Sequence, residues 1–290
     1  MPYPILNLPY GLQQRLCALA TPREKYLLQT ATGLMQHHLK PIQSTVNLSN
    51  QHSHILHKHK GTVELITFSA DGVSYEYFPK FDNSHSKLIT LKSTLRLEEL
   101  TENELDDTFF NHTLLRIQTL SFVRTSANDS VLQRISTNCL SPIIKYHAGY
   151  VKDGNLVNIG RLFTLFPYLQ DIQLCESMNV NKNWLRDILK LENQKLNTLS
   201  LQGTVDNLIS FNSNELVQLF MTRRDMFLEL CVTDNPSVDA IAKISTLINK
   251  ECFKTATSCQ RPVLHLRFSN PLCNNLPLYY NFRTQTSNVN

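Results

Sequence analysis

The first thirty residues place leucines at helical spacing. Leu12, Leu16 and Leu19 recur at i, i+4 and i+7, which predicts one apolar stripe along a helix. Pro9 stands just before them, where its fixed φ and missing N–H suit the first helical residue. We therefore predict a helix that begins at Pro9 and carries leucines on one face.

A second helix is predicted directly after a Thr-Pro corner. Thr21 and Glu24 have the spacing of a capping box, and Pro22 lies between them in the first turn. Gly33 then stands at a distance suited to the left-handed residue that commonly ends a helix. Isolated helices of this length are marginal in water, so we expect the pair to need a partner.

Residues 36–62 are polar and show neither helical nor strand periodicity, and we predict a linker. Histidines in this stretch could in principle bind a metal ion. They lack an acidic or thiolate partner of fixed geometry, so a solvated segment is favoured. These histidines are His37, His38, His52, His54, His57 and His59.

Alternation of apolar and polar residues begins at Val63. The stretches 63–69 and 73–78 are rich in β-branched and aromatic residues, and Asp71-Gly72 between them has the composition of a tight turn. We predict a β-hairpin that opens a second domain.

Short apolar strands then recur at regular spacing. Their centres are 27 residues apart four times in succession, and then 30 and 36 residues apart. A period of this size with a helix in each repeat is typical of strand-and-helix solenoids. Residues 169–174 and 196–201 fit the pattern L-x-x-L-x-L. The predicted strand centres are Leu91, Gln118, Lys145, Ile172, Leu199, Glu229 and His265.

Helix start signals lie between these strands. They are Thr101 with Glu104, Asp129 or Ser130, Asn181, Ser213 and Asn235-Pro236. The sequence therefore predicts an α/β fold, with a short N-terminal helical hairpin followed by an irregular leucine-rich-repeat-like strand/helix solenoid. A less regular α/β domain is the alternative, because the Asn ladder of standard leucine-rich repeats is missing.

The same patterns predict four segments along the chain. They are a helical segment at 1–35, the linker at 36–62, the strand-and-helix domain at 63–275 and a C-terminal tail at 276–290.

Composition narrows the classes of protein. The chain of 290 residues is 42% hydrophobic and 18% charged, which suffices for a sizeable core. Its net charge of +4 is small and the basic residues are dispersed, so no nucleic-acid partner is expected. An apolar run of membrane-spanning length and a signal peptide are both missing, so no membrane partner is expected and the predicted location is cytoplasmic and/or nuclear.

Seven cysteines are scattered along the chain and never spaced as Cys-x-x-Cys. An odd, scattered set indicates neither a disulfide framework nor a zinc knuckle, and we interpret them as small apolar residues in a reducing compartment. They are Cys17, Cys139, Cys175, Cys231, Cys252, Cys259 and Cys273.

Motifs of catalysis are missing from the sequence. The chain has eight glycines and no glycine-rich phosphate loop, G-x-S-x-G elbow or H-E-x-x-H helix. We therefore expect no catalytic residue, cofactor or metal. Trp184 shares a helical stripe with Leu185 and Ile188, and we predict that it lies in the core.

The N-terminal segment resembles an F-box. That family combines a hydrophobic residue, Leu-Pro, a leucine-spaced helix, a polar-Pro corner and a second leucine-rich helix; its usual third helix has no counterpart after residues 31–33. The resemblance implies docking on a Skp-type adaptor subunit and, through it, on a cullin. The residues that match, and that would bind the adaptor, are Leu6, Leu8, Pro9, Leu12, Leu16, Leu19, Pro22, Leu27 and Leu28.

Residues 63–270 are similar in pattern to the C-terminal half of nematode-type F-box proteins, which carry an FTH or FBA-type domain. The two resemblances together imply a substrate-recognition adaptor of an SCF-type ubiquitin ligase. Such an adaptor holds a target protein near the conjugating enzyme and contributes proximity and orientation, so it needs no catalytic residue.

Alternation along the strands predicts the target-binding residues. Apolar positions should face the helices, and the intervening positions should face the open side of the sheet. The alternative is a non-enzymatic leucine-rich-like interaction scaffold unconnected with ubiquitination, whose hairpin caps the end of the solenoid. The predicted exposed row is Asp171, Gln173, Thr198, Ser200, Glu229, His265 and Arg267.

Overall fold

In the computed structural model the chain forms two compact units. The first comprises residues 1–118 and 129–142, and the second comprises 119–128 and 143–290. Strand β6 (Thr113–Val123) passes from the first unit into the second. The structure describes residues 5–33, 39–47, 53–68, 75–78, 87–149, 157–175, 180–191, 195–223, 225–233, 244, 246, 253–255, 264–268 and 278–282.

The first unit begins with the predicted pair of helices, α1 (Tyr10–Leu19) and α2 (Pro22–Ala31), after a 3-10 turn at Ile5–Asn7. The capping box is confirmed: the Thr21 amide donates to Glu24 Oε2 at 2.9 Å, and the Glu24 amide donates to Thr21 Oγ1 at 3.3 Å. Gly33 has a φ of +58° just after α2, as predicted for a helix end. Pro9 is the N-cap of α1, so the helix begins at Tyr10, one residue later than predicted.

The sheet of the first unit has the order β5-β2-β3-β4, with β1 beside β5. β2 pairs antiparallel with β3 and parallel with β5, and β1 pairs parallel with β5. The predicted hairpin is confirmed as the antiparallel pair β3 and β4, while its turn at residues 71–72 lies outside the described residues. These strands are β1 (Thr45–Asn47), β2 (Ser53–His59), β3 (Thr62–Phe68), β4 (Tyr75–Phe78) and β5 (Leu88–Glu98).

The predicted linker at 36–62 is wrong where β1 and β2 lie. In β2 the buried positions are His54 and Leu56, so a histidine occupies a site where alternation calls for an apolar residue. Its ring is satisfied inside the sheet: Nε2 accepts from the Lys92 amide at 3.2 Å, and Nδ1 lies 3.1 Å from Thr67 Oγ1. His37, His38 and His52 lie outside the described residues.

Helices of the first unit follow the start signals. The 3-10 helix Glu102–Glu104 has the predicted Thr101 and Glu104 capping box. α3 spans Asp107–His112, and α4 spans Asp129–Asn138, so the helix predicted to start at Asp129 or Ser130 includes both of these residues. The core of the unit lies among leucines of β2, β3 and β5, several of which are fully buried.

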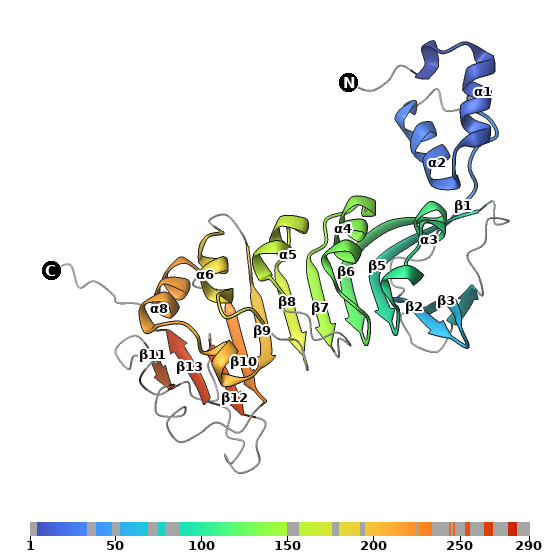
Figure 1. Ribbon diagram of the computed structural model, residues 1–290. Helices are drawn as coiled ribbons and strands as arrows, with labels where there is room; N and C mark the ends of the chain where they lie inside the picture. The colour runs from blue at the N-terminus through green and yellow to red at the C-terminus, as the bar shows by residue number, and fades with distance from the viewer. Residues whose placement is uncertain are drawn as a thin grey trace. The chain divides into compact units, whose positions relative to one another are not determined.

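The second unit has a mostly parallel sheet in the order β6-β7-β8-β9-β10-β12-β13-β11 (Figure 1). Neighbours from β6 to β12 pair in parallel; β13 pairs antiparallel with β12 and β11. The bounds are β7 (Lys145–Gly149), β8 (Asp171–Cys175), β9 (Thr198–Gly203), β10 (Phe227–Val232), β11 (Phe253–Thr255), β12 (Leu264–Phe268) and β13 (Leu278–Phe282).

All seven predicted strand centres lie in strands, two in β5 and β6 and five in β7, β8, β9, β10 and β12. The predicted tail at 276–290 is wrong at β13, which pairs along Leu278–Tyr280 with β12. The chain is therefore of the mixed α/β class that the sequence predicts.

Helices alternate with these strands, and α6 contacts both α5 and α8. They are α5 (Ile159–Leu165), α6 (Trp184–Leu189), α7 (Val205–Leu208) and α8 (Ser213–Thr222). The start signal of α8 is Asn212 rather than Ser213, because Asn212 forms a capping box with Glu215. The segment predicted to be helical after residues 235–236 lies largely outside the described residues.

Trp184 lies in the core of the second unit, as predicted. Its side chain is fully buried, and its indole N–H donates to the carbonyl of Leu208 at 3.1 Å. The ring packs edge-on against Phe211, with 5.6 Å between centroids. None of the helices in the described residues is long and apolar enough to cross a membrane.

A two-residue turn that the sequence analysis missed joins β2 to β3. Lys60 and Gly61 have φ values of +48° and +86°, and His59 pairs with Thr62, which is the geometry of a type I′ hairpin. Around Gly61 an added Cβ would meet nothing within 4 Å, so only the backbone conformation selects glycine there.

We predict that Gly61→Ala lowers the free energy of unfolding by about 1 kcal/mol, because a left-handed residue with a Cβ is strained. Lys60→Gly, which relieves the same strain one residue earlier, is the matched variant and should leave stability unchanged or slightly higher. Denaturant unfolding followed by circular dichroism measures both. Equal stability of Gly61→Ala and the unmodified chain would contradict the assigned turn.

Candidate functional site

The N-terminal hairpin turns its leucines outward. The exposed fractions are 76% for Leu19, 52% for Leu12 and 36% for Leu16. Among the described side chains of α1 and α2, the buried ones are Gln13, Cys17 and Gln29. On α1 the usual arrangement of apolar residues inside and polar residues outside is therefore largely reversed.

Leucines of the two helices together line a groove. Leu16 and Leu19 of α1 and Leu27, Leu28 and Ala31 of α2 enclose about 450 Å³, with Glu24 the charged residue of the lining. The Glu24 carboxylate is already engaged in the capping box. We call Leu12, Leu16, Leu19, Leu27 and Leu28 the leucine face.

The groove thus brings together four of the nine residues predicted to bind an adaptor, namely Leu16, Leu19, Leu27 and Leu28. Leu8 and Pro22 are half-buried, and Pro9 is exposed at the start of α1. The side chain of Leu6 lies outside the described residues. Tyr10, which the sequence analysis missed, is 72% exposed beside Pro9 in the chain and extends the apolar surface of α1.

Gln29 binds the last turn of α2 to the chain that follows. Its side chain is 3% exposed, and Nε2 donates to the carbonyls of Leu39 at 2.7 Å and Pro41 at 2.9 Å. Its Oε1 accepts from the amide of Gln43 at 2.9 Å. Both ends of this buried amide are therefore satisfied by the segment that leads into β1.

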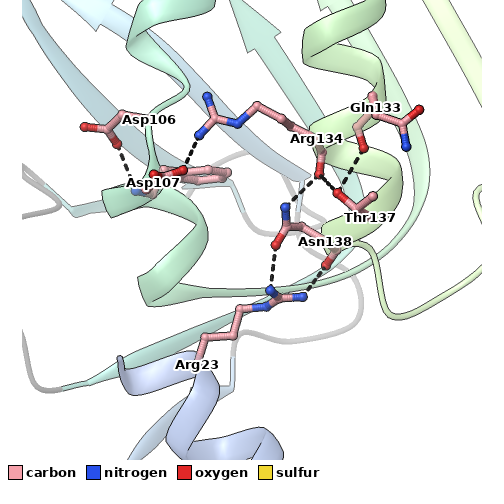
Figure 2. A network of polar contacts seen from close by, with 8 residues as sticks. Arg23, Asp106, Asp107, Gln133, Arg134, Thr137 and Asn138 are labelled. Carbon is pink, nitrogen blue, oxygen red and sulfur yellow. Dashed lines mark hydrogen bonds and ion pairs between the residues drawn. The ribbon is translucent and has the colours of Figure 1, made fainter. Parts of the chain in front are cut away.

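Arg23 binds the first turn of α2 to helix α4 (Figure 2). Its Nη1 donates to Asn138 Oδ1 at 2.6 Å and its Nη2 to the Asn138 carbonyl at 3.2 Å. Asn138 ends α4, where a cation is favourable. Burial lowers the pKa of Arg23 while Glu24 acts in the opposite direction, and an arginine remains protonated in this setting.

Tyr26, which lies between Arg23 and Gln29 on α2, makes a third polar contact. The hydroxyl of Tyr26 accepts from Arg116 Nη2 at 3.4 Å. Arg23, Tyr26 and Gln29 recur every three residues, and we call them the anchoring face of α2. The sequence gives no signal for it beyond this spacing, because arginine and glutamine are ordinary residues of solvated helix surfaces and tyrosine is commonly half-buried.

The contacts of Arg23 continue into helix α3 (Figure 2). Asn138 Nδ2 donates to the carbonyl of Arg134 at 2.8 Å, and Arg134 Nη2 donates to Asp107 Oδ1 at 2.6 Å. The Arg134 guanidinium also lies over the Phe110 ring, 5.1 Å from its centroid. One polar network therefore joins α2, α4 and α3.

A second candidate surface lies on the sheet of the second unit. In β8, β9 and β10 the leucines at alternate positions are fully buried, and the polar residues between them point to the other face. The strand register aligns these polar residues across five strands. We call the aligned set the polar row; it consists of His147, Gln173, Ser200, Glu229 and His265.

Five of the seven residues predicted on this surface are half-buried on that face, namely Asp171, Gln173, Thr198, Ser200 and Glu229. The prediction of exposure is wrong for His265, which is 8% exposed, because its Nδ1 lies 2.9 Å from Glu229 Oε1. The side chain of Arg267 lies outside the described residues. Lys145 and His147 were missed, although the same alternation one strand earlier identifies them.

The chemistry of the polar row suits binding. Glu229 accepts from Ser200 Oγ at 2.7 Å on one side and faces His265 on the other. A hydrolytic triad needs the histidine to contact the serine, and here the carboxylate stands between them. Lys145 lies 3.4 Å from Asp171, so the charges occur in opposite pairs across the strands.

A polar cavity of about 600 Å³ lies where α6 and α8 end and β9 and β10 begin. Its best candidate for binding an anion is Arg223, but Nη2 of that side chain donates to the carbonyls of Ile188 and Leu191. Burial lowers the pKa of Arg223. The guanidinium therefore completes the end of α6, and we assign no ligand to this cavity.

No family model matches the chain, and neither a curated protein nor a solved structure matches it. Within the part of the chain that the structure describes, no three His, Cys, Asp or Glu side chains are grouped to hold a metal ion. The leucine face and the polar row therefore carry the functional interpretation.

We predict that protonation of His147 destabilises the protein. Burial, assisted by Lys145 and opposed by Asp171, lowers the pKa of His147 below 6.5. The unfolded chain therefore binds this proton more readily, so stability is full above pH 6.5 and falls as the pH drops toward the lowered pKa.

The measurement is the denaturant midpoint between pH 7.5 and pH 5.5. His147→Gln should lose less stability over this range than the unmodified chain, and His59→Gln, at an exposed position, controls for removal of an imidazole. An identical loss in His147→Gln and the unmodified chain would contradict the assignment.

Proposed function

We propose that the chain is a substrate-recognition adaptor of an SCF-type ubiquitin ligase. In this proposal the hairpin binds a Skp-type adaptor subunit and, through it, a cullin, while the polar row binds a target protein. The observation that supports it best is the outward-facing leucine face on a segment that resembles an F-box. No step of bond making falls to this chain, so no catalytic residue is needed.

The energetics of the leucine face favour a protein partner. Burying one leucine side chain contributes about 1.5–3 kcal/mol, and soluble proteins seldom leave contiguous apolar surface exposed unless it is an interface. Three leucines of α1 are at least 36% exposed, and the groove between α1 and α2 offers apolar side chains on both walls. A helix with apolar side chains fits such a groove.

Charges around the leucine face indicate the character of that partner. Glu24 is engaged by the capping box, and Arg23 by Asn138. The remaining charged residues of the two helices are Arg15, which is exposed, and Lys25, which is half-buried, and both are basic. We therefore expect acidic residues beside the apolar ones on the adaptor surface.

An irregular leucine-rich-repeat-like arrangement is part of the proposal. Parallel strands from β6 to β12 and the helices α5 to α8 between them support it. In this arrangement the buried apolar residues of each strand pack toward the helices and leave the polar row for the target. The hydroxyl, amide and imidazole groups of the row suit hydrogen bonding to a protein surface.

The alternative function is a non-enzymatic interaction scaffold unconnected with ubiquitination. There the hairpin would only cap the end of the repeats, and its apolar side chains would pack against the chain itself. Leu12 and Leu19 remain more than half exposed, which favours the adaptor.

We predict that Leu12→Asp combined with Leu19→Asp abolishes binding to a purified Skp-type adaptor. Loss of two leucines from the interface removes about 3 kcal/mol of binding free energy, which weakens binding at least ~100-fold. Because both positions are exposed, the unfolding midpoint should not change. Calorimetric titration of the full chain measures the affinity.

The matched control is Leu140→Asp, which makes the same change at a leucine that is 41% exposed and does not belong to the leucine face. This variant should bind as the unmodified chain does. Undiminished binding by the Leu12 and Leu19 variant, or no binding by the unmodified chain, would reject the F-box assignment.

A separate variant tests the target surface. Gln173→Arg combined with Thr198→Arg places two bulky cations on the face that carries the polar row, while the leucine face is untouched. We expect a tagged chain with these changes to co-purify with the Skp-type adaptor but to lose its target, as measured by quantitative mass spectrometry. Thr137→Arg, at an exposed position of α4, is the control. Unchanged recovery of every co-purifying protein would place the target surface elsewhere.

A further inference from the structure

Helix α2 has two chemically different sides. The anchoring face binds other parts of the first unit, whereas Leu27, Leu28 and Ala31 line the groove of the leucine face. The contacts that hold the hairpin are thus made by side chains that do not belong to its docking surface. Changes in one side of the helix can therefore be separated from changes in the other.

Directional bonds dominate the attachment of the hairpin. Among the described side chains of α1 and α2, Cys17 is the fully buried apolar one, while Tyr26, Leu27 and Leu28 are half-buried, so most of the fully buried side chains are polar. Hydrogen bonds require a defined distance and angle between donor and acceptor, whereas apolar contact is non-directional. An element held mainly by hydrogen bonds is fixed in orientation as well as in place.

The two anchors that make more than one hydrogen bond lie at opposite ends of α2. Arg23 in the first turn makes a two-pronged contact with the end of α4, and Gln29 in the last turn makes three hydrogen bonds to residues 39–43. Six residues of helix separate them by about 9 Å. Two fixed points along a rod determine its direction.

We propose that Arg23 and Gln29, with Tyr26 between them, are positioning residues that set the direction in which the leucine face points from the first unit. This inference rests on the proposed function, because direction matters when an adaptor must present a bound target toward a conjugating enzyme. The inference also separates two properties of the hairpin. The leucine face determines its affinity for the adaptor, and the anchoring face determines its orientation on the first unit.

The test measures the distance between α1 and α4 in the full chain. Ketone-bearing residues introduced at the exposed positions Ala18 and Gln133 carry spin labels and leave the native cysteines untouched. Pulsed dipolar spectroscopy should give one narrow distance distribution. In the double variant Arg23→Ala with Gln29→Ala the distribution should widen at least twofold, while affinity for a purified Skp-type adaptor stays within twofold.

Conservative variants refine the result. Arg23→Lys keeps a cation at the end of α4 but loses the two-pronged contact, and Gln29→Glu still accepts from the Gln43 amide but cannot donate to the carbonyls of Leu39 and Pro41. Each should widen the distribution less than the double variant does. Thr30→Ala on α2 and Arg15→Ala on α1 are the controls, since the Thr30 hydroxyl donates to the Tyr26 carbonyl within α2 and Arg15 is exposed. Both should keep the narrow distribution.

Amide hydrogen exchange in α1 and α2 distinguishes loss of orientation from loss of folding. Protection in both helices should be retained in the double variant. An unchanged distance distribution, or widening accompanied by loss of that protection, would overturn the inference. Failure of the unmodified chain to bind the Skp-type adaptor would instead refute the proposed function and leave the distance result standing.

Discussion

The functional account depends on the way helix α2 is held to the first unit. The terminal nitrogens of Arg23 bond to the end of α4, and both ends of the Gln29 amide bond to residues 39–43, so the side of α2 that faces the unit is polar. Leucines that would usually face inward are left on the outer side, where they meet those of α1. A buried glutamine amide costs free energy unless its hydrogen bonds are made, and all those of Gln29 are made within the chain. The polar anchor and the leucine face thus use different side chains of the hairpin, so a partner can cover the leucines without replacing the bonds of the anchor.

Much of the fold could be predicted because its determinants are local or periodic. The capping box of Thr21 and Glu24 needs four residues, and the strands near Ile172 and Leu199 repeat one alternation of buried and half-buried positions. Parallel strands separated by helices recur at a spacing that the leucines reveal. The leucines of the hairpin were identified for the same reason, since helical spacing is a property of the sequence. Their exposure was not predictable from spacing, because a stripe of leucines looks alike whether it faces a core or a partner.

The failures involve polar residues whose partners are distant in the sequence. His54 interrupts the apolar pattern of β2. Its burial is favourable because Thr67 and the Lys92 amide, which are distant in the sequence, bond to its ring. The anchor between Arg23 and Asn138 spans 115 residues, and nothing local in either segment indicates it. Alternation along β12 predicted that His265 is exposed. It is buried instead, with its Nδ1 2.9 Å from the carboxylate of Glu229 on the neighbouring strand. Long-range polar pairing therefore sets the limit of the sequence analysis.

The central claim is that the leucine face is open in the free chain and covered by a Skp-type adaptor. Carbene footprinting with residue-level mass spectrometry tests this most directly, because the reagent labels accessible side chains regardless of their chemistry. The account predicts strong labelling of Leu12, Leu16 and Leu19 in the free chain and their protection by an equimolar Skp-type adaptor, while labelling of the exposed Tyr168 is unchanged. Labelling of the three leucines in the free chain as weak as that of the fully buried Leu97 would contradict it.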